Sequence, residues 1–204
     1  MQRVINSSSN LYPHDLEKTV LYYKGEIIWN NPALAIVGSR DCSAQAENKI
    51  LNIMKSIPAN VVIVSGLARG VDSIAHETAI KLERRTIAVL PCGIDIIYPR
   101  ENISLGSLIL EKGGMLVSEY KGTISPSKKS FILRNRIITG LSSAILVAEA
   151  KIKSGTMHAV NSAKKQRKII YAIPGSEGTD FLISKGALDA SNLPLIFKND
   201  KKKL

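Results

Sequence analysis

The stretch Val61-Val-Ile-Val-Ser-Gly-Leu-Ala-Arg-Gly-Val-Asp72 decides the fold class of this chain. Its lead, Val61 to Val64, is apolar throughout, which is typical of a strand buried on both faces of a parallel sheet. Gly66 and Gly70 then allow a tight turn and a close approach of the backbone to a ligand. Asp72 stands where a helix begins, and a helix start leaves backbone N–H groups free to meet an anion. Alone, the stretch fits an ordinary strand-to-helix turn as well as an anion cradle.

Short apolar runs of this kind recur along the chain, and the segments between them have helical spacing. Such a pattern predicts an α/β fold with a doubly wound, mainly parallel sheet. Helical spacing is clearest over residues 47–57, 71–83 and 155–165, and Pro58 ends the first of these segments. The predicted strands are Leu34–Val37, Val61–Val64, Thr86–Leu90, Met115–Val117, Ala144–Ala148 and Ile169–Ile173.

The chain divides into one large unit and two short flanks. Residues 1–32 are expected to form an extended lead-in packed on the main domain, with a turn at Lys24-Gly25 and one strand around Leu21–Tyr23. Residues 33–197 form the predicted α/β domain, and residues 198–204 form a basic tail. At 204 residues the chain is long enough for one such domain with its own core.

The charge of the chain points to a polyanionic partner. The formal net charge is +11 and the isoelectric point is near 9.7. The tail 198–204 accounts for +3 of this charge and leaves +8 in the body of the domain. Such a surface can gather nucleic acid, although it also fits a protein that is merely basic and soluble.

Membrane, redox and metal functions have little support in the sequence. No apolar run approaches the length of a membrane span, and the polar first ten residues lack the apolar region of a signal peptide, so we expect a cytoplasmic protein. Cys42 and Cys92 are too few for a disulfide framework, and the three histidines show no zinc spacing. We therefore expect reduced cysteines, no metal and no cofactor.

The residues that follow the predicted strands are candidates for binding, because ligands of doubly wound sheets collect at the carboxyl ends of the strands. Gly38, Ser39 and Arg40 follow the first predicted strand of the domain. The guanidinium of Arg40 can donate two parallel hydrogen bonds to a phosphate group. Ser65–Gly70 follows the second. Ser154, Gly155 and Thr156 place small hydrogen-bonding residues at another helix start.

A loop predicted over residues 125–136 combines basic, amide and aromatic side chains, which suits a strand of nucleic acid. Lysine and arginine side chains bind phosphate groups, and a phenylalanine such as Phe131 can stack on an exposed base. An alternative reading makes Phe131 a core residue and pairs Arg134 and Arg136 with carboxylates such as Glu119 or Glu149. The full set of predicted binding residues is Gly38, Ser39, Arg40, Ser65, Gly66, Ala68, Arg69, Gly70, Lys128, Lys129, Phe131, Arg134, Asn135, Arg136, Ser154, Gly155 and Thr156.

Several enzyme signatures are missing from the sequence. The chain has no G-x-x-x-x-G-K-[ST], no G-x-G-x-x-G and no G-x-S-x-G, which argues against a P-loop NTPase, a nicotinamide enzyme and an elbow-type hydrolase. Asp72 and His76 are four residues apart and could form an acid–base pair, but a helix cap beside a packed imidazole is the favoured interpretation. We therefore predict no catalytic residue.

Taken in order, these motifs resemble the DprA/Smf family of DNA-processing proteins over about residues 11–190. The matching elements are Ile36–Arg40, Val64–Asp72 with His76, Gly93–Asp95 through Tyr98-Pro99, Ser118-Glu119, Phe131-x-x-Arg134-Asn135-Arg136 through Ser142, Glu149-Ala150, Ser154–Thr156 and Pro174-Gly175.

The resemblance implies an extended Rossmann-like domain that binds single-stranded DNA without hydrolysing it. It also implies that the protein assists loading of the recombinase RecA, takes part in natural transformation and DNA recombination, and forms a homodimer. The family's DNA pocket maps to Arg40, Lys128 and Phe131, with Lys129 as an alternative to Lys128. No winged-helix module follows the domain, so any function that needs one is expected to be absent or supplied elsewhere.

Two other functions stay open. The first is a nucleoside-monophosphate phosphoribohydrolase of the LOG type, whose signature is partly echoed by Pro174–Asp180. In this chain Ser176 replaces the second glycine of that signature and Leu182 replaces its catalytic glutamate. The second is a sensor of small nucleotides or phosphates, because a phosphate cradle does not reveal the length of its ligand.

Overall fold

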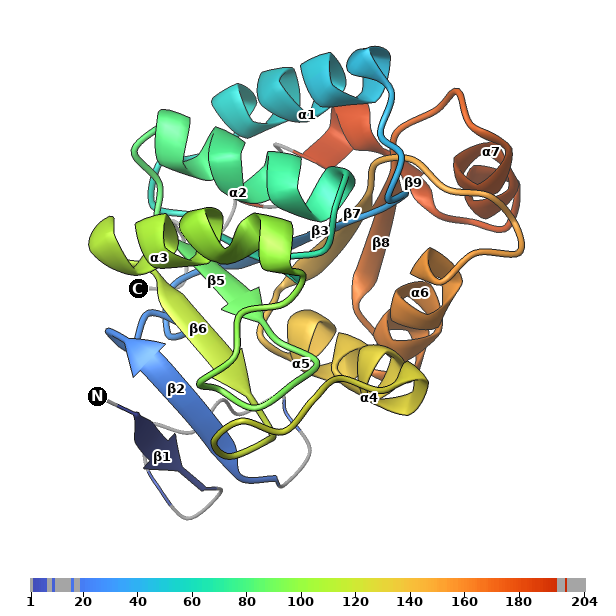
Figure 1. Ribbon diagram of the computed structural model, residues 1–204. Helices are drawn as coiled ribbons and strands as arrows, with labels where there is room; N and C mark the ends of the chain where they lie inside the picture. Colours follow the sequence, from blue (N-terminus) through green and yellow to red (C-terminus); the bar gives the residue numbers. More distant parts are fainter. Residues whose placement is uncertain (1, 7–8, 10–15, 17–18, 194–196, 198–204) are drawn as a thin grey trace.

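The structure, a computed structural model, describes residues 2–6, 9, 16, 19–193 and 197. These residues form a nine-stranded sheet with the strand order β1-β2-β6-β5-β4-β3-β7-β8-β9 (Figure 1). The six strands from β3 to β8 run parallel, which confirms the predicted doubly wound sheet. The strands are β1 Arg3–Ile5, β2 Leu21–Gly25, β3 Ala33–Val37, β4 Val62–Ser65, β5 Thr86–Val89, β6 Met115–Ser118, β7 Ala144–Val147, β8 Ile169–Ala172 and β9 Leu188–Asp189.

Helices cover both faces of this sheet (Figure 1). Helices α1, α2 and α3 pack against one face, and α5, α6 and α7 contribute to the cluster on the other. In the described part of the chain the helices are α1 Ala44–Ser56, α2 Val71–Lys81, α3 Ile103–Glu111, α4 Lys128–Leu133, α5 Asn135–Gly140, α6 Thr156–Lys165 and α7 Glu177–Ser184, with 3₁₀ turns at Arg100–Asn102 and Ala190–Asn192.

The predicted strands are buried as their composition requires. Every residue of β3, β4, β5, β6 and β7 is buried. Within β3, Leu34 and Ile36 pack against the helices of one face, whereas Ala35 and Val37 belong to the cluster on the other. A strand that alternates between two apolar layers reads as an unbroken apolar run, and this explains why these strands were visible in the sequence.

The N-terminal flank joins the same sheet. Strand β2 pairs antiparallel with β6, and β1 pairs antiparallel with β2. The turn predicted at Lys24-Gly25 is wrong, because both residues lie in β2 and pair with β6. Gly25 takes a positive φ of 93°, and a Cβ there would overlap the carbonyl of Gly114. The predicted lead-in residues Leu11–Pro13 and the tail 198–204 lie outside the described residues.

The segment predicted as a loop over residues 125–136 is largely helical, which corrects that prediction. Ser127 caps α4 by accepting a hydrogen bond from the amide of Ser130, and Ser130 Oγ accepts one from the amide of Ser127. This reciprocal pair is a capping box built with serine in the place of the usual glutamate. Because the motif is usually recognised by glutamate or glutamine at that position, the start of α4 was not visible in the sequence.

The order of the strands creates a reversal between β3 and β7. The chain moves outward from β3 through β4 and β5 to β6, then crosses back to β7 on the other side of β3. In open α/β sheets the crevice outside the carboxyl ends of two such strands is where ligands bind. None of the helices in the described residues has the length and apolar character that a membrane span requires.

Candidate nucleic-acid interface

A pocket of about 470 Å³ opens at the carboxyl ends of β3 and β7, where the strand order reverses. The loop after β3, the start of α2, the α4–α5 junction and the start of α6 all contribute to its wall. The pocket brings together these predicted binding residues: Gly38, Ser39, Arg40, Ala68, Phe131, Arg134, Asn135, Ser154, Gly155 and Thr156.

The remaining predicted residues do not line this pocket. Arg69 is exposed and its Nε lies 3.4 Å from Oε1 of Glu101. Arg136 pairs with Glu119, as the alternative reading of the sequence held. Lys128 and Lys129 are exposed at the start of α4, one helical turn before the pocket residues Phe131 and Ile132. Outside the pocket wall lie Ser65, Gly66, Arg69, Gly70, Lys128, Lys129 and Arg136.

The glycines of the opening stretch make room for protein atoms, and their approach to a ligand stays a prediction. A Cβ on residue 66 would overlap the guanidinium of Arg134. A Cβ on residue 70 would overlap the carbonyl oxygens of Ser39 and Arg40, and Gly70 has a positive φ of 72°. These two glycines let the loop after β4 pack against the α4–α5 junction and against the loop after β3.

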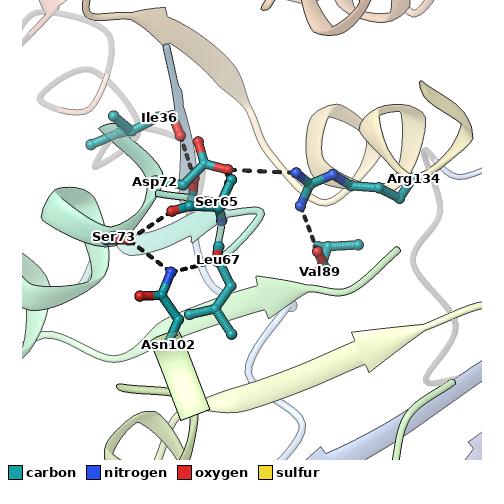
Figure 2. A network of polar contacts seen from close by, with 9 residues as sticks. Ile36, Ser65, Leu67, Asp72, Ser73, Val89, Asn102 and Arg134 are labelled. Carbon is teal, nitrogen blue, oxygen red and sulfur yellow. Dashed lines mark hydrogen bonds and ion pairs between the residues drawn. The ribbon is translucent and has the colours of Figure 1, made fainter. Parts of the chain in front are cut away.

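A buried ion pair joins these elements at the floor of the pocket. The Arg134 guanidinium lies 3.5 Å from the Asp72 carboxylate and donates a hydrogen bond of 2.7 Å to the carbonyl of Val89 (Figure 2). Both side chains are more than nine-tenths buried. Burial raises the pKa of Asp72, an effect that the neighbouring guanidinium opposes, and burial lowers the pKa of Arg134. The pairing predicted for Arg134 with Glu119 or Glu149 is wrong, because its partner is Asp72.

The same network fixes the chain around the opening stretch. Ser65 Oγ donates to the carbonyl of Ile36 at 2.6 Å, which ties β4 to β3. The side-chain amide of Asn102 donates to the carbonyl of Leu67 at 2.8 Å and to Ser73 Oγ at 2.9 Å (Figure 2). These bonds tie the loop after β4 to β3 and to Asn102.

Two polar atoms at the pocket have no hydrogen-bond partner among the described residues. Nε of Arg134 and Oγ of Ser154 are both buried, and both residues line the pocket. Helix α6 begins beside Ser154, and no side chain caps its first turn. The ligand-accessible cations of the pocket are Arg40 and Lys151, and together with the positive end of α6 they favour an anion there.

Arg40 is held by an aromatic pair at the pocket rim. Its guanidinium carbon lies 5.6 Å from the centroid of the Phe131 ring, within the range of a cation–π contact. The Tyr98 ring packs against Phe131 with centroids 5.7 Å apart and an angle of 66° between the planes. Sequence reasoning missed Tyr98, because its contact with Phe131 joins segments 33 residues apart.

Asp72 and His76 do not form an acid–base pair. The His76 ring is fully buried and its Nδ1 lies 2.8 Å from the hydroxyl of Thr86. Burial and the positive charge of Arg134 lower the pKa of His76 to about 3, so the ring is neutral at physiological pH. The packed imidazole favoured from the sequence is confirmed.

Eight further residues of the pocket were not among the predicted set. These are Val37, Asp41, Asp72, Ile132, Ile138, Lys151, His158 and Ala159. Lys151 lies four residues after the end of β7, so the rule that pointed to strand ends could have found it. His158 lies in the first turn of α6, and nothing in the local sequence set it apart.

Comparison with known proteins identifies the family. The sequence model of the family described as DNA recombination-mediator protein A matches residues 3–198. The chain belongs to the DprA/Smf family. It is 38% identical to the DNA processing protein DprA of Streptococcus pneumoniae over 188 residues, which cover 86% of this chain and 66% of that protein. It is 36% identical to the protein Smf of Escherichia coli over 209 residues, which cover 96% of this chain and 56% of that protein.

Solved structures of DprA proteins have the same fold. The DprA structure of Streptococcus pneumoniae superposes with a TM-score of 0.88 at 34% identity, covering 94% of this chain and 72% of the other. The DprA structure of Helicobacter pylori, which concerns the single-stranded DNA binding mode of that protein, gives a TM-score of 0.83 at 29% identity and covers 98% and 97% of the two chains. A molybdenum cofactor binding protein of Rippkaea orientalis, at 16% identity and a TM-score of 0.57, shares the fold alone.

Proposed function

We propose that this DprA/Smf chain binds single-stranded DNA in the pocket between β3 and β7 and does not cut it. The observation that carries the proposal is a basic pocket at the carboxyl edge of the sheet. Arg40 and Lys151 are exposed there beside the start of α6, whose first turn no side chain caps, in a chain of net charge +11. A phosphate group of a nucleic acid suits such a site, and the relative from Helicobacter pylori is described as binding single-stranded DNA.

Arg40 in the pocket and Lys128 on α4, the helix that carries Phe131, are the proposed contacts to the DNA backbone. Arg40 lines the pocket, and its guanidinium packs over the Phe131 ring. This contact orients the guanidinium before a phosphate group binds. Lys128 is exposed on the first turn of α4, with Lys129 beside it. Contacts of this type are made to the charged backbone and carry no base specificity, so we expect the protein to bind DNA of any base sequence.

The buried network supports a role without catalysis. His76 is sealed in the core and neutral, and Asp72 is held by Arg134, so neither is free to move a proton at a substrate. The LOG-type alternative meets the same obstacle, because Leu182 stands in place of the catalytic glutamate and is buried in the core. A sensor of small nucleotides is the second candidate, since one pocket of about 470 Å³ has room for a single nucleotide.

The wider role follows from family membership. We infer that the chain assists loading of a RecA-type recombinase on single-stranded DNA, acts in natural transformation and recombination, forms a homodimer and works in the cytoplasm. This chain spans 66% and 56% of the lengths of the first two relatives. Sedimentation of the protein alone tests the dimer, and the rate of RecA filament formation with and without the protein tests the loading role.

The DNA-binding proposal is tested by titrating labelled oligonucleotides at several salt concentrations. Single-stranded DNA should bind more tightly than duplex DNA or mononucleotides, with a log–log salt slope of about −0.7 for each phosphate contact. Tight binding of a mononucleotide with no gain from a longer strand would favour the sensor instead. Product analysis of the same mixtures should show no turnover.

A further inference from the structure

We propose that Tyr98 forms a second subsite beside the pocket, which takes one unpaired nucleobase of the bound strand. This inference rests on the proposed binding of single-stranded DNA and adds the place where a base is held. It starts from the rim of the pocket, where an arginine and two aromatic rings meet: Arg40, Phe131 and Tyr98.

Phe131 already has neighbours on its ring. The Arg40 guanidinium lies over it at 5.6 Å from the centroid, and the Tyr98 ring meets it at a steep angle of 66°. A guanidinium over an aromatic face competes with a base for the same surface, because both contacts use the π electrons of that face. Phe131 is therefore better placed to orient Arg40 than to stack on a base while Arg40 stays where it is.

Tyr98 has the exposure that a base-stacking ring needs. It is 38% exposed, whereas Tyr23 and Tyr171 are buried in the core clusters. Exposed aromatic rings in nucleic-acid proteins bind any base, since every base has a π face. The Tyr98 ring is therefore in contact with Phe131 and partly exposed to solvent at the same time.

The segment that carries Tyr98 is anchored rather than loose. The amide of Ile94 donates to the carbonyl of Tyr120 at 3.0 Å, and that of Asp95 donates to the carbonyl of Gly122 at 3.0 Å. Beyond Tyr98, the side chain of Asn102 bonds to Leu67 and Ser73 in the pocket floor. A ring fixed in this way loses little freedom when a base stacks on it, so more of the stacking energy appears as affinity.

The chemistry around the ring matches a strand of DNA. Arg100 is exposed two residues after Tyr98, and Lys128 and Lys129 are exposed on the helix that carries Phe131. An aromatic ring flanked by cations binds a base together with the phosphates on either side of it. The proposed occupant is thus an unpaired base, and a paired base in a duplex is excluded because its faces are covered by its neighbours.

The test compares an ordinary single-stranded oligonucleotide with one of the same length in which every base is replaced by an abasic site. Tyr98→Leu should weaken binding of the ordinary strand about 5- to 150-fold and change binding of the abasic strand less than about twofold. Its salt slope should equal that of the unsubstituted protein, because the ring contacts no phosphate. Tyr98→Trp should retain the affinity.

The matched control is Phe181→Leu, which removes another ring, 39% exposed and with Lys185 5.8 Å from its centroid, on a helix that does not line the pocket. It should bind both strands as the unsubstituted protein does. Equal losses for both strands in Tyr98→Leu, or no loss for either, overturn the base subsite while the DNA-binding function stands. If the unsubstituted protein binds no single-stranded DNA, the proposed function and the subsite fall together.

Discussion

The loop after β4 and helix α4 each carry several of the predicted binding residues, yet they differ in what they contact. After β4, Gly66 packs on Arg134, and Asp72 in the first turn of α2 pairs with the same guanidinium, so the polar contacts of this region are largely made within the protein. On α4, Lys128 and Lys129 are exposed and Phe131 lines the pocket. The comparison shows that a glycine-rich strand-to-helix turn can support a pocket whose exposed cations come from other segments.

This difference has a physical cause. Charged groups in the core are costly unless they are paired, so Asp72 and Arg134 are stable there only together. Surface cations such as Lys128 contribute little to stability but attract a polyanion. Substitutions in the inner network should therefore reduce stability first, whereas substitutions on the outer surface should reduce affinity alone.

The largest effect is expected from Arg134→Met. It leaves the Asp72 carboxylate buried without its partner and removes the donor to the Val89 carbonyl, so the free energy of unfolding should fall by about 3–5 kcal/mol. Urea denaturation measures this loss. The double variant Asp72→Leu with Arg134→Met should recover much of it, since no charge then stays buried. An Arg134→Met protein of normal stability but no DNA affinity would show that the arginine belongs to the outer surface after all.

Acidification should weaken the inner region through His76. The pKa of His76 is lowered to about 3 in the folded chain and is ordinarily near 6.5. Between these two pH values the ring is protonated in the unfolded chain and neutral in the folded chain. The stability that depends on the neutral ring is complete above pH 6.5 and falls as the pH drops toward 3, by about 1.4 kcal/mol per pH unit. Urea denaturation at pH 7 and pH 4.5 should differ by about 2–3 kcal/mol from this group. His76→Gln should flatten the profile, and an unchanged profile in that variant contradicts the assignment.

A smaller effect is expected from Gly66→Ala. The new Cβ would overlap a guanidinium that Asp72 and Val89 hold in place, which should destabilise the fold by about 1–3 kcal/mol. Gly155→Ala is the matched control for stability, because no atom lies within 4 Å of a Cβ built at that position. Thermal unfolding of the two variants compares them directly. Equal stability with a specific loss of DNA affinity in Gly66→Ala would restore the idea that this glycine faces the ligand.

The strands and the general position of the site were predictable from sequence, and the reasons are local. Runs such as Val61–Val64 are apolar because both faces of the strand are covered, and Arg40 and Ser154 were found because they follow strands. The partner of Arg134 was not predictable, since Asp72 lies 62 residues away and belongs to another layer of the fold. The contact of Tyr98 with Phe131 was not predictable for the same reason, because only folding brings these two residues together.

The most direct test of the account is the salt dependence of single-stranded DNA binding in Arg40→Ala and Lys128→Ala, beside the unsubstituted protein and the exposed control Lys55→Ala on α1. We predict weaker binding and a log–log slope shallower by about 0.7 for each of the first two variants, with melting temperatures unchanged. Lys55→Ala should match the unsubstituted protein. A salt response that is flat, or that is the same in all four proteins, would contradict the pocket as the site of DNA binding.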